Sequence, residues 1–312
     1  MAALHVRLFG RFELDRAQAP APVLHARHAC ELLSYLVLHR DHPQRREALA
    51  GQLWTDAAPA QGAKYLRQAL WQLQAALRPV LDDGAAHLLE VDPEWVQLNS
   101  CDALQADVIG FEAATRACQG KPGAGLDEGA RRQLENAVSL YRGDLLEGWY
   151  QDWCLFERER LQNDFLDTLE KLVCACEAHR ESELGLVHAR RILAFDPARE
   201  QVHRHVMRLQ QQTGNRTGAL RAFQRCEHIL QEELGVAPSP QTRALYEAIR
   251  DGRAMDPEAR TETGQDALQA SPQPQLPELA ELLSRAQALF ASIESRLRQE
   301  IVPPGPSPDK RD

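Results

Sequence analysis

The chain of 312 residues has no uninterrupted run of 18 apolar residues, and arginines interrupt its first stretch, MAALHVRLFGRF. A helix needs about 20 apolar residues to cross a bilayer, and a signal peptide needs an apolar stretch near its start. We therefore expect no membrane partner and no export, and the sequence predicts a cytoplasmic protein.

Cysteine pairs at metal-binding spacing are also missing. The seven cysteines are irregularly spaced and none forms a C-x-x-C pair. Cys174 and Cys176 are two residues apart in a helical stretch, so they point to different sides and are poorly placed to share a metal. This pattern is typical of reduced, structural thiols in a cytoplasmic protein. No metal site and no cofactor is predicted.

Motifs of common enzyme classes are not found. The sequence contains neither G-x-x-x-x-G-K-[ST] nor G-x-S-x-G, and the glycine-rich QGKPGAG at 119–125 does not follow a strand. His203 and His205 are two residues apart on a predicted helix, so we interpret them as surface or groove histidines. The charged ERER at 157–160 is interpreted as a solvated helix start. The sequence therefore predicts that the protein is not an enzyme.

An excess of positive charge is absent too, since the formal net charge is −9. Residues 1–99 hold 10 basic and 11 acidic side chains, and residues 100–250 hold 19 and 23. Nucleic-acid binding, if present, must come from a local basic patch rather than from a globally basic domain.

The first 99 residues show the order of elements of a winged helix-turn-helix. Residues 4–15 alternate apolar and polar side chains with a bend near Gly10, which predicts a half-buried strand pair. Three helical stretches follow, the third stopping before Pro79, and then a β-hairpin turns at Asp92–Pro93. Strands, three helices and a hairpin in this order indicate a DNA-binding domain at 1–99 with an added N-terminal sheet.

The third predicted helix has a leucine stripe at Leu66, Leu70, Leu73 and Leu77. With this stripe inside, its opposite face carries glutamines and basic side chains. Glutamine can pair with adenine, arginine with guanine, and lysine with phosphate. An ordinary solvated helix face is the alternative. The predicted DNA-contacting residues on this helix and at the start of the preceding one are Arg45, Arg46, Gln61, Lys64, Arg67, Gln68, Trp71 and Gln72.

Residues 100–250 read as helix throughout and contain a repeat with a period of 34. Gly185 and Leu186 recur as Ala219 and Leu220, the small-then-large pattern of tetratricopeptide repeats. We therefore expect a tetratricopeptide-like helical array at 100–250, so that the whole fold is mainly α with a small β component.

The end of the chain divides into three predicted segments. Residues 251–275 are polar and read as a flexible linker, and residues 301–312 read as a disordered tail. Between them, apolar residues recur every three or four positions over 276–300, which predicts an amphipathic helix. This helix either pairs with its twin in a homodimer or folds back on its own array, and we favour the homodimer.

The stretch LYRGDLLEGWYQDW at 140–153 gathers two of the five tryptophans and two of the five tyrosines. An active site, a ligand cage and a structural junction are the possible interpretations. No nucleophile with an adjacent base is visible, and large aromatic side chains can bury much area. We favour a structural junction in which Trp149, Tyr150 and Trp153 take part.

The chain resembles transcriptional activators of the Streptomyces antibiotic regulatory protein type over residues 1 to about 250. The resemblance rests on LFGRFEL, ACELLSYLVLHRD, ALAGQLW, YLRQALWQLQAAL, LYRGDLLEGWYQDW with FERERL, ILAFDPAREQVHRHVMRL, and GALRAFQRCEHILQEELGVAPSPQTRALYEAIR. It implies a winged helix fused to a tetratricopeptide-like bacterial transcriptional activator domain, binding to promoter DNA, and contact with RNA polymerase.

The recognition helix departs from the usual pattern of that family. Tyr65 stands where asparagine is common and Trp71 where serine is common, while Gln72, Gln74 and Ala75 stand where arginines are frequent. The expected function is a DNA-binding transcriptional activator. The alternative is a helical ligand- or protein-binding signalling module whose DNA binding is weak or lost.

Overall fold

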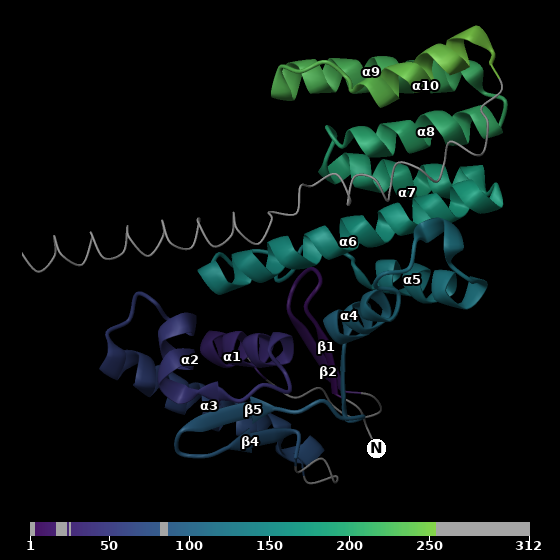
Figure 1. Cartoon of the computed structure of the whole chain (residues 1–312). Coiled ribbons are helices and arrows are strands. Elements are labelled where there is room, and N and C mark those ends of the chain that lie inside the picture. The colour runs from purple at the N-terminus through teal and green to yellow at the C-terminus, as the bar shows by residue number, and fades with distance from the viewer. Residues whose placement is uncertain (1–3, 17–23, 25, 82–86, 254–312) are drawn as a thin grey trace, which may run out of the picture. The chain divides into compact units, whose positions relative to one another are not determined.

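A computed structural model describes residues 4–16, 24, 26–81 and 87–253 of the chain (Figure 1). Within these ranges the protein is mainly helical with a small β component, which confirms the predicted fold class. The predicted amphipathic helix at 276–300, the tail at 301–312 and all but the first three residues of the predicted linker lie outside the described residues.

The winged helix-turn-helix is built as the sequence predicts. Its helices are α1 (Arg27–Leu38), α2 (Arg46–Leu53) and α3 (Pro59–Leu81), and α3 packs against both others. The sheet has the order β3-β5-β4, in which β4 (Leu89–Val91) and β5 (Trp95–Leu98) form the predicted hairpin. The third strand is the short β3 (Gln44–Arg45), which pairs with β5 just before α2 begins.

The end predicted for the third helix is wrong. Helix α3 continues through Pro79 to Leu81 instead of stopping before the proline. Pro79 lies in the last turn, so the hydrogen bond that its missing N–H removes is one of the last in the helix.

A second sheet joins the N-terminus to the beginning of the helical region. Strand β1 (Leu4–Arg7) pairs antiparallel with β2 (Glu13–Arg16) and parallel with β6 (Leu104–Ala106). The predicted bend is confirmed, since Gly10 has a φ of 94°, which glycine adopts readily. The expectation that residues 100–250 are all helical is wrong at β6, because three residues are too short to show an alternating pattern.

In the described part of the chain, seven α-helices follow β6, and those from α6 onward stack along the array (Figure 1). A short 3-10 turn, η1 (Gly123–Gly125), lies between the first two. The helices are α4 (Asp107–Ala117), α5 (Glu128–Leu140), α6 (Asp152–His179), α7 (Ser182–Phe195), α8 (Glu200–Gln212), α9 (Arg216–Leu234) and α10 (Pro240–Asp251).

The repeat with a period of 34 corresponds to α7 and α9, and its small residues lie where helices come close. A Cβ atom added to Gly185 would meet Cys176 Cβ and Leu209 Cδ1 at 3.0 Å. Ala219 at the equivalent place in α9 is fully buried. A small side chain is needed at both positions because neighbouring helices of the array approach each other there.

The interpretation of the two histidines of α8 as surface or groove residues is wrong, because both are buried. His203 Nε2 lies 2.9 Å from the carbonyl oxygen of Pro197, and burial lowers the pKa of His203. His205 Nδ1 lies 2.7 Å from Glu177 Oε2 of α6. Burial disfavours the charged form of His205. The hydrogen bonds and charges of Cys174 and Glu177 favour that form more strongly, and the net effect raises the pKa of His205 to about 9.

We expect His205 to stabilise the array at neutral pH and to lose this effect in alkali. A pKa that is higher in the folded state than in the unfolded state stabilises the fold below the unfolded value of about 6.5. That contribution disappears as the pH rises through about 9. Urea unfolding of the wild type and of His205→Asn should show a larger difference in unfolding free energy at pH 6.5 than at pH 9.5. If the two proteins differ in unfolding free energy by the same amount at pH 6.5 and pH 9.5, the charged His205–Glu177 pair does not stabilise the fold in this way.

Candidate nucleic-acid interface

The exposed face of α3 is the strongest candidate for a binding surface. The helix spans 23 residues, contains Lys64, Arg67 and Arg78, and has no aspartate or glutamate. Its leucine stripe is buried in the core of the winged helix, as predicted. The basic side chains and the glutamines therefore lie on the side that faces solvent, and the local charge of this helix is positive although the chain as a whole is negative.

The structure places the predicted contact residues of α3 together on that face. Gln61, Lys64, Arg67 and Gln68 are exposed, and Gln72 is partly exposed. Trp71 has 70% of its surface exposed, an unusual position for so large an aromatic side chain. Amide, cationic and flat aromatic groups thus lie within three turns of one helix, the combination that contacts base edges and phosphates.

The two arginines predicted at the start of α2 differ in their surroundings. The Arg45 side chain is exposed, with its Cζ 5.0 Å from the centre of the Trp95 ring. Arg46 is partly buried, and its Nη1 donates to the carbonyl oxygen of Asp92 at 3.0 Å. Arg45 is therefore free to approach a phosphate, whereas Arg46 fixes the turn of the hairpin.

The hairpin itself adds negative charge. Asp92 Oδ1 accepts hydrogen bonds from the backbone N–H groups of Glu94 and Trp95 at 2.8 and 2.7 Å, which defines the turn. Glu90 and Glu94 flank that turn. Three carboxylates would repel a phosphate backbone, so attractive contacts must come from α2 and α3 rather than from the tip of this wing.

A buried carboxylate connects the winged helix to the helical array. Glu31 of α1 is 2% exposed, and its Oε2 accepts a hydrogen bond from Trp54 Nε1 at 2.8 Å. Its Oε1 accepts from Gln151 Nε2 at 2.7 Å and from Arg27 Nε at 2.9 Å. Trp54 follows α2 and Gln151 precedes α6, so one side chain joins the helix-turn-helix to the start of α6.

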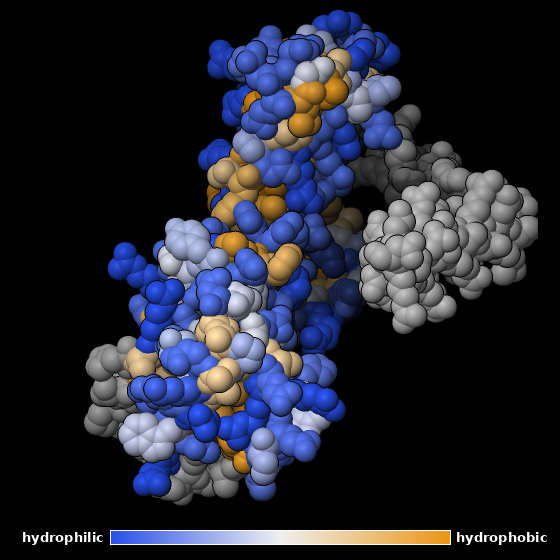
Figure 2. Space-filling model, turned by 90° about the vertical axis from the view of Figure 1, so that its left-hand side faces the viewer, coloured by the Kyte–Doolittle hydropathy of each residue, from blue (hydrophilic) through white to orange (hydrophobic). Residues whose placement is uncertain are grey.

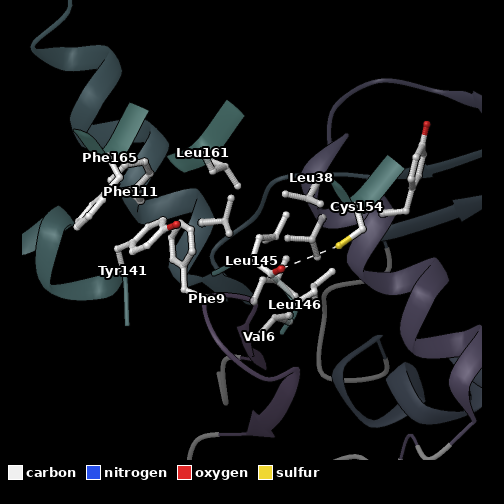
Figure 3. Packing of buried hydrophobic residues seen from close by; sticks show 14 of the residues in the cluster. Val6, Phe9, Leu38, Phe111, Tyr141, Leu145, Leu146, Cys154, Leu161 and Phe165 are labelled. Atoms are coloured by element: carbon white, nitrogen blue, oxygen red, sulfur yellow. Dashed lines mark hydrogen bonds between the residues drawn. The ribbon is translucent and has the colours of Figure 1, made fainter. Parts of the chain in front are cut away.

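The stretch 140–153 also lies at this junction. The N–H of Gly10 donates to the carbonyl oxygen of Asp144, and the N–H groups of Leu146 and Glu147 donate to the carbonyl oxygens of Leu8 and Gly10. The segment thus continues the strand pairing of β1. In Figure 3, Leu145 and Leu146 lie in the hydrophobic cluster between the N-terminal elements and the helices.

Arg158 of α6 holds the same loop from the other side. Its Nε donates to the carbonyl oxygen of Leu145, and its Nη2 donates to those of Leu146 and Trp149, each at 2.9 Å. Leu146 is buried with a φ of 50°, a left-handed conformation that is costly for a leucine. The interpretation of ERER as a solvated helix start is therefore wrong for Arg158, which fixes a strained loop.

The three aromatic residues predicted to form the junction do not behave alike. Trp153 is 4% exposed, and its ring contacts Tyr35 of α1 and Trp149 edge-on at centroid distances of 5.5 and 6.4 Å. Trp149 is partly buried. The expectation that Tyr150 buries its ring is wrong, since 76% of it is exposed on the loop before α6. Trp153 Nε1 has no hydrogen bond within the described residues.

Sequence reasoning missed the buried polar side chains that organise this region. Asp107 at the start of α4 accepts hydrogen bonds from the N–H groups of Leu8 and Phe9, and burial raises its pKa. Glu31 and Arg158 are the others. A signal existed for Glu31 alone, which is the single charge inside the apolar run ACELLSYLVL.

Among the described residues, no group of three or more His, Cys, Asp and Glu side chains is arranged to hold a metal ion. None of the helices in the same ranges is both long and apolar enough to cross a bilayer. On the face drawn in Figure 2 the surface is mostly hydrophilic, with small separate hydrophobic patches.

Comparison with known proteins finds similarity to bacterial transcriptional regulators. Residues 106–250 match the family described as bacterial transcriptional activator domain. The transcriptional regulatory protein MoaR1 of Mycobacterium bovis is 28% identical over 228 residues, which cover 72% of this chain and 72% of that protein. The regulatory protein DnrI of Streptomyces peucetius is 26% identical over 247 residues, which cover 72% of this chain and 84% of that protein.

A solved structure agrees with the fold. Mycobacterium tuberculosis EmbR in complex with a low affinity phosphopeptide has a TM-score of 0.68 and 22% sequence identity, and the match covers 82% of this chain and 67% of that chain. This likeness confirms the architecture of a winged helix followed by a helical array.

Proposed function

We propose that the chain is a transcriptional regulator of the Streptomyces antibiotic regulatory protein type, with a bacterial transcriptional activator domain at 106–250, and that it binds promoter DNA through α3. The observation that supports this most is the outward face of α3, where glutamines and basic side chains are exposed and acidic ones are absent. On this proposal the protein acts in the cytoplasm and has no enzymatic activity.

Each exposed side chain has a proposed role set by its chemistry. Lys64 and Arg67 neutralise phosphates, and Gln68 and Gln72 contact base edges in the major groove. Trp71 gives an apolar contact of the kind that suits a thymine methyl group. Arg45 supplies a further phosphate contact, while Arg46 keeps the hairpin in place.

Activation requires a second contact, which we assign to the helical array. The resemblance implies RNA polymerase as the partner of this domain. A homodimer held by residues 276–300 remains a prediction on a segment outside the described residues. Two DNA-binding heads would raise the affinity for repeated sites without any new base contact.

The proposed DNA contacts predict different results for two substitutions. Lys64→Ala should weaken binding to every sequence and lower the slope of log K against log salt concentration by about 1. Gln68→Ala should relax the preference at one base position, at a cost of roughly 1–3 kcal/mol if the contact is bidentate. Gel shifts with the chain's own promoter region at several salt concentrations measure both effects.

Lys121→Ala is the matched control, because it removes the same charge from an exposed residue between α4 and α5. It should leave affinity and salt slope unchanged. If Lys64→Ala and Gln68→Ala behave like this control, α3 does not enter the groove. If the wild type fails to bind even at low salt, the signalling-module alternative replaces DNA binding, and the acidic hairpin favours that outcome.

A further inference from the structure

Three side chains of the array are arranged in line at the contact between α6 and α8. Cys174 Sγ lies 3.7 Å from His205 Nε2, and His205 Nδ1 lies 2.7 Å from Glu177 Oε2. Cys174 is partly exposed, whereas the His205 and Glu177 side chains are only 9% and 10% exposed. A thiol, an imidazole and an orienting carboxylate in this order resemble the arrangement that activates a nucleophile.

The buried pair keeps the imidazole in its charged form at neutral pH. Burial opposes that charge, but the contacts with Cys174 and Glu177 raise the pKa of His205 to about 9. Both ring nitrogens of an imidazolium carry protons, so Nδ1–H donates to Glu177 and Nε2–H points to the sulfur. An imidazolium in this position can donate its Nε2 proton to a group that leaves when the sulfur reacts.

Two cationic side chains lie on the same two helices as the pair. Arg208 of α8 has its Nη1 3.9 Å from Glu177 Oε2, and Lys171 of α6 donates its Nζ to the carbonyl oxygen of Cys118. The turn η1, which packs against Cys174, consists of glycine and alanine and contributes no charged side chain.

Within the described residues, no other cysteine has an imidazole within hydrogen-bonding distance of its sulfur. Cys176, two residues further along α6, is fully buried, and burial raises its pKa to about 11. Burial likewise raises the pKa of Cys30 and Cys154 to about 11 and that of Cys226 to about 12. Cys101 is exposed, and no charged partner within hydrogen-bonding distance is found for it among the described residues.

We propose that Cys174 is a modification site, a thiol that the Glu177–His205 pair activates toward hydroperoxides. The sulfur of the thiolate attacks one peroxide oxygen and forms an S–O bond while the O–O bond breaks. The leaving oxygen is hydroxide from hydrogen peroxide or alkoxide from an organic hydroperoxide. It takes the Nε2 proton of His205 and is released as water or an alcohol. The thiol is oxidised to sulfenic acid and the peroxide is reduced, with His205 left neutral.

The test treats the full chain with hydrogen peroxide, traps sulfenic acid with dimedone, and measures initial labelling rates of each cysteine peptide by mass spectrometry. At pH 6.5 an ordinary exposed thiol is only about 1% thiolate. If the pair activates Cys174, this thiol should be labelled roughly tenfold faster than Cys101 at pH 6.5. The ratio should fall as the pH rises to 8.5, where a larger share of ordinary exposed thiols is ionised.

Glu177→Gln separates activation from simple exposure, because the amide keeps the size of the side chain and removes its charge. In this variant the ratio at pH 6.5 should fall toward one, while Cys101 labelling stays the same. Should Cys174 of the wild type react no faster than Cys101 at pH 6.5, or keep its advantage in a folded Glu177→Gln variant, the proposal is wrong. If Glu177→Gln does not fold, the ratio of Cys174 to Cys101 labelling in the wild type at pH 6.5 and 8.5 tests the proposal by itself.

Discussion

Trp153→Ala should lower the free energy of unfolding by roughly 3–5 kcal/mol. The indole is 4% exposed and fills the space between α1 and the first turn of α6, where it contacts Tyr35 and Trp149. Removing so large a ring leaves a cavity at the contact between the winged helix and the array, which neighbouring side chains can fill only in part. Chemical denaturation followed by circular dichroism measures the loss.

Two further variants show whether burial of the Trp153 ring explains the lower free energy of unfolding. Trp153→Phe should cost much less, since the indole Nε1 has no hydrogen bond to lose within the described residues. Trp71→Ala should leave stability nearly unchanged, because that side chain is 70% exposed. Full stability of Trp153→Ala combined with lost activation would instead favour the ligand cage.

Arg158→Ala should lower the free energy of unfolding by about 2–4 kcal/mol. The guanidinium donates to three backbone carbonyl oxygens of the loop 145–149, and two of them belong to fully buried leucines. Without it these acceptors lose a charged donor, and the left-handed conformation of Leu146 loses its support. Thermal and urea unfolding measure the change.

Arg158→Lys is the informative companion, since one ammonium group cannot replace a planar guanidinium that spans three carbonyl oxygens. We expect it to recover less than half of the loss. Arg132→Ala is the control, because its exposed pair with Glu128 on α5 is screened by solvent and contributes little to stability. A loss at Arg158 no larger than at Arg132 would show that the loop does not depend on this side chain.

The local pattern of the sequence predicted the elements and the exposed face of α3. The stripe of Leu66, Leu70, Leu73 and Leu77 follows the helical period, so it fixed which side of α3 is buried. The alternation of residues 4–15 and the turn at Asp92 were recognisable for the same reason, because each depends on neighbours in the sequence.

What the sequence did not reveal depends on contacts between distant segments. Glu31 accepts a hydrogen bond from Gln151, which lies 120 residues further along the chain, and no local sequence pattern predicts that partner. His203 and His205 were assigned to the surface because their spacing does not show that α8 is covered on several sides. Tyr150 illustrates the opposite error, since composition suggested burial and the fold leaves it exposed.

Helix α3 is the element that we propose selects promoter DNA. The most direct test is genome-wide mapping of sites bound in the cell by the full chain and by a variant carrying Lys64→Ala and Gln68→Ala. We predict that the wild type occupies a limited set of promoter regions with a shared sequence, and that the variant loses them at equal protein level. Occupancy of the same sites by both proteins, or no enriched site for the wild type, would contradict the account.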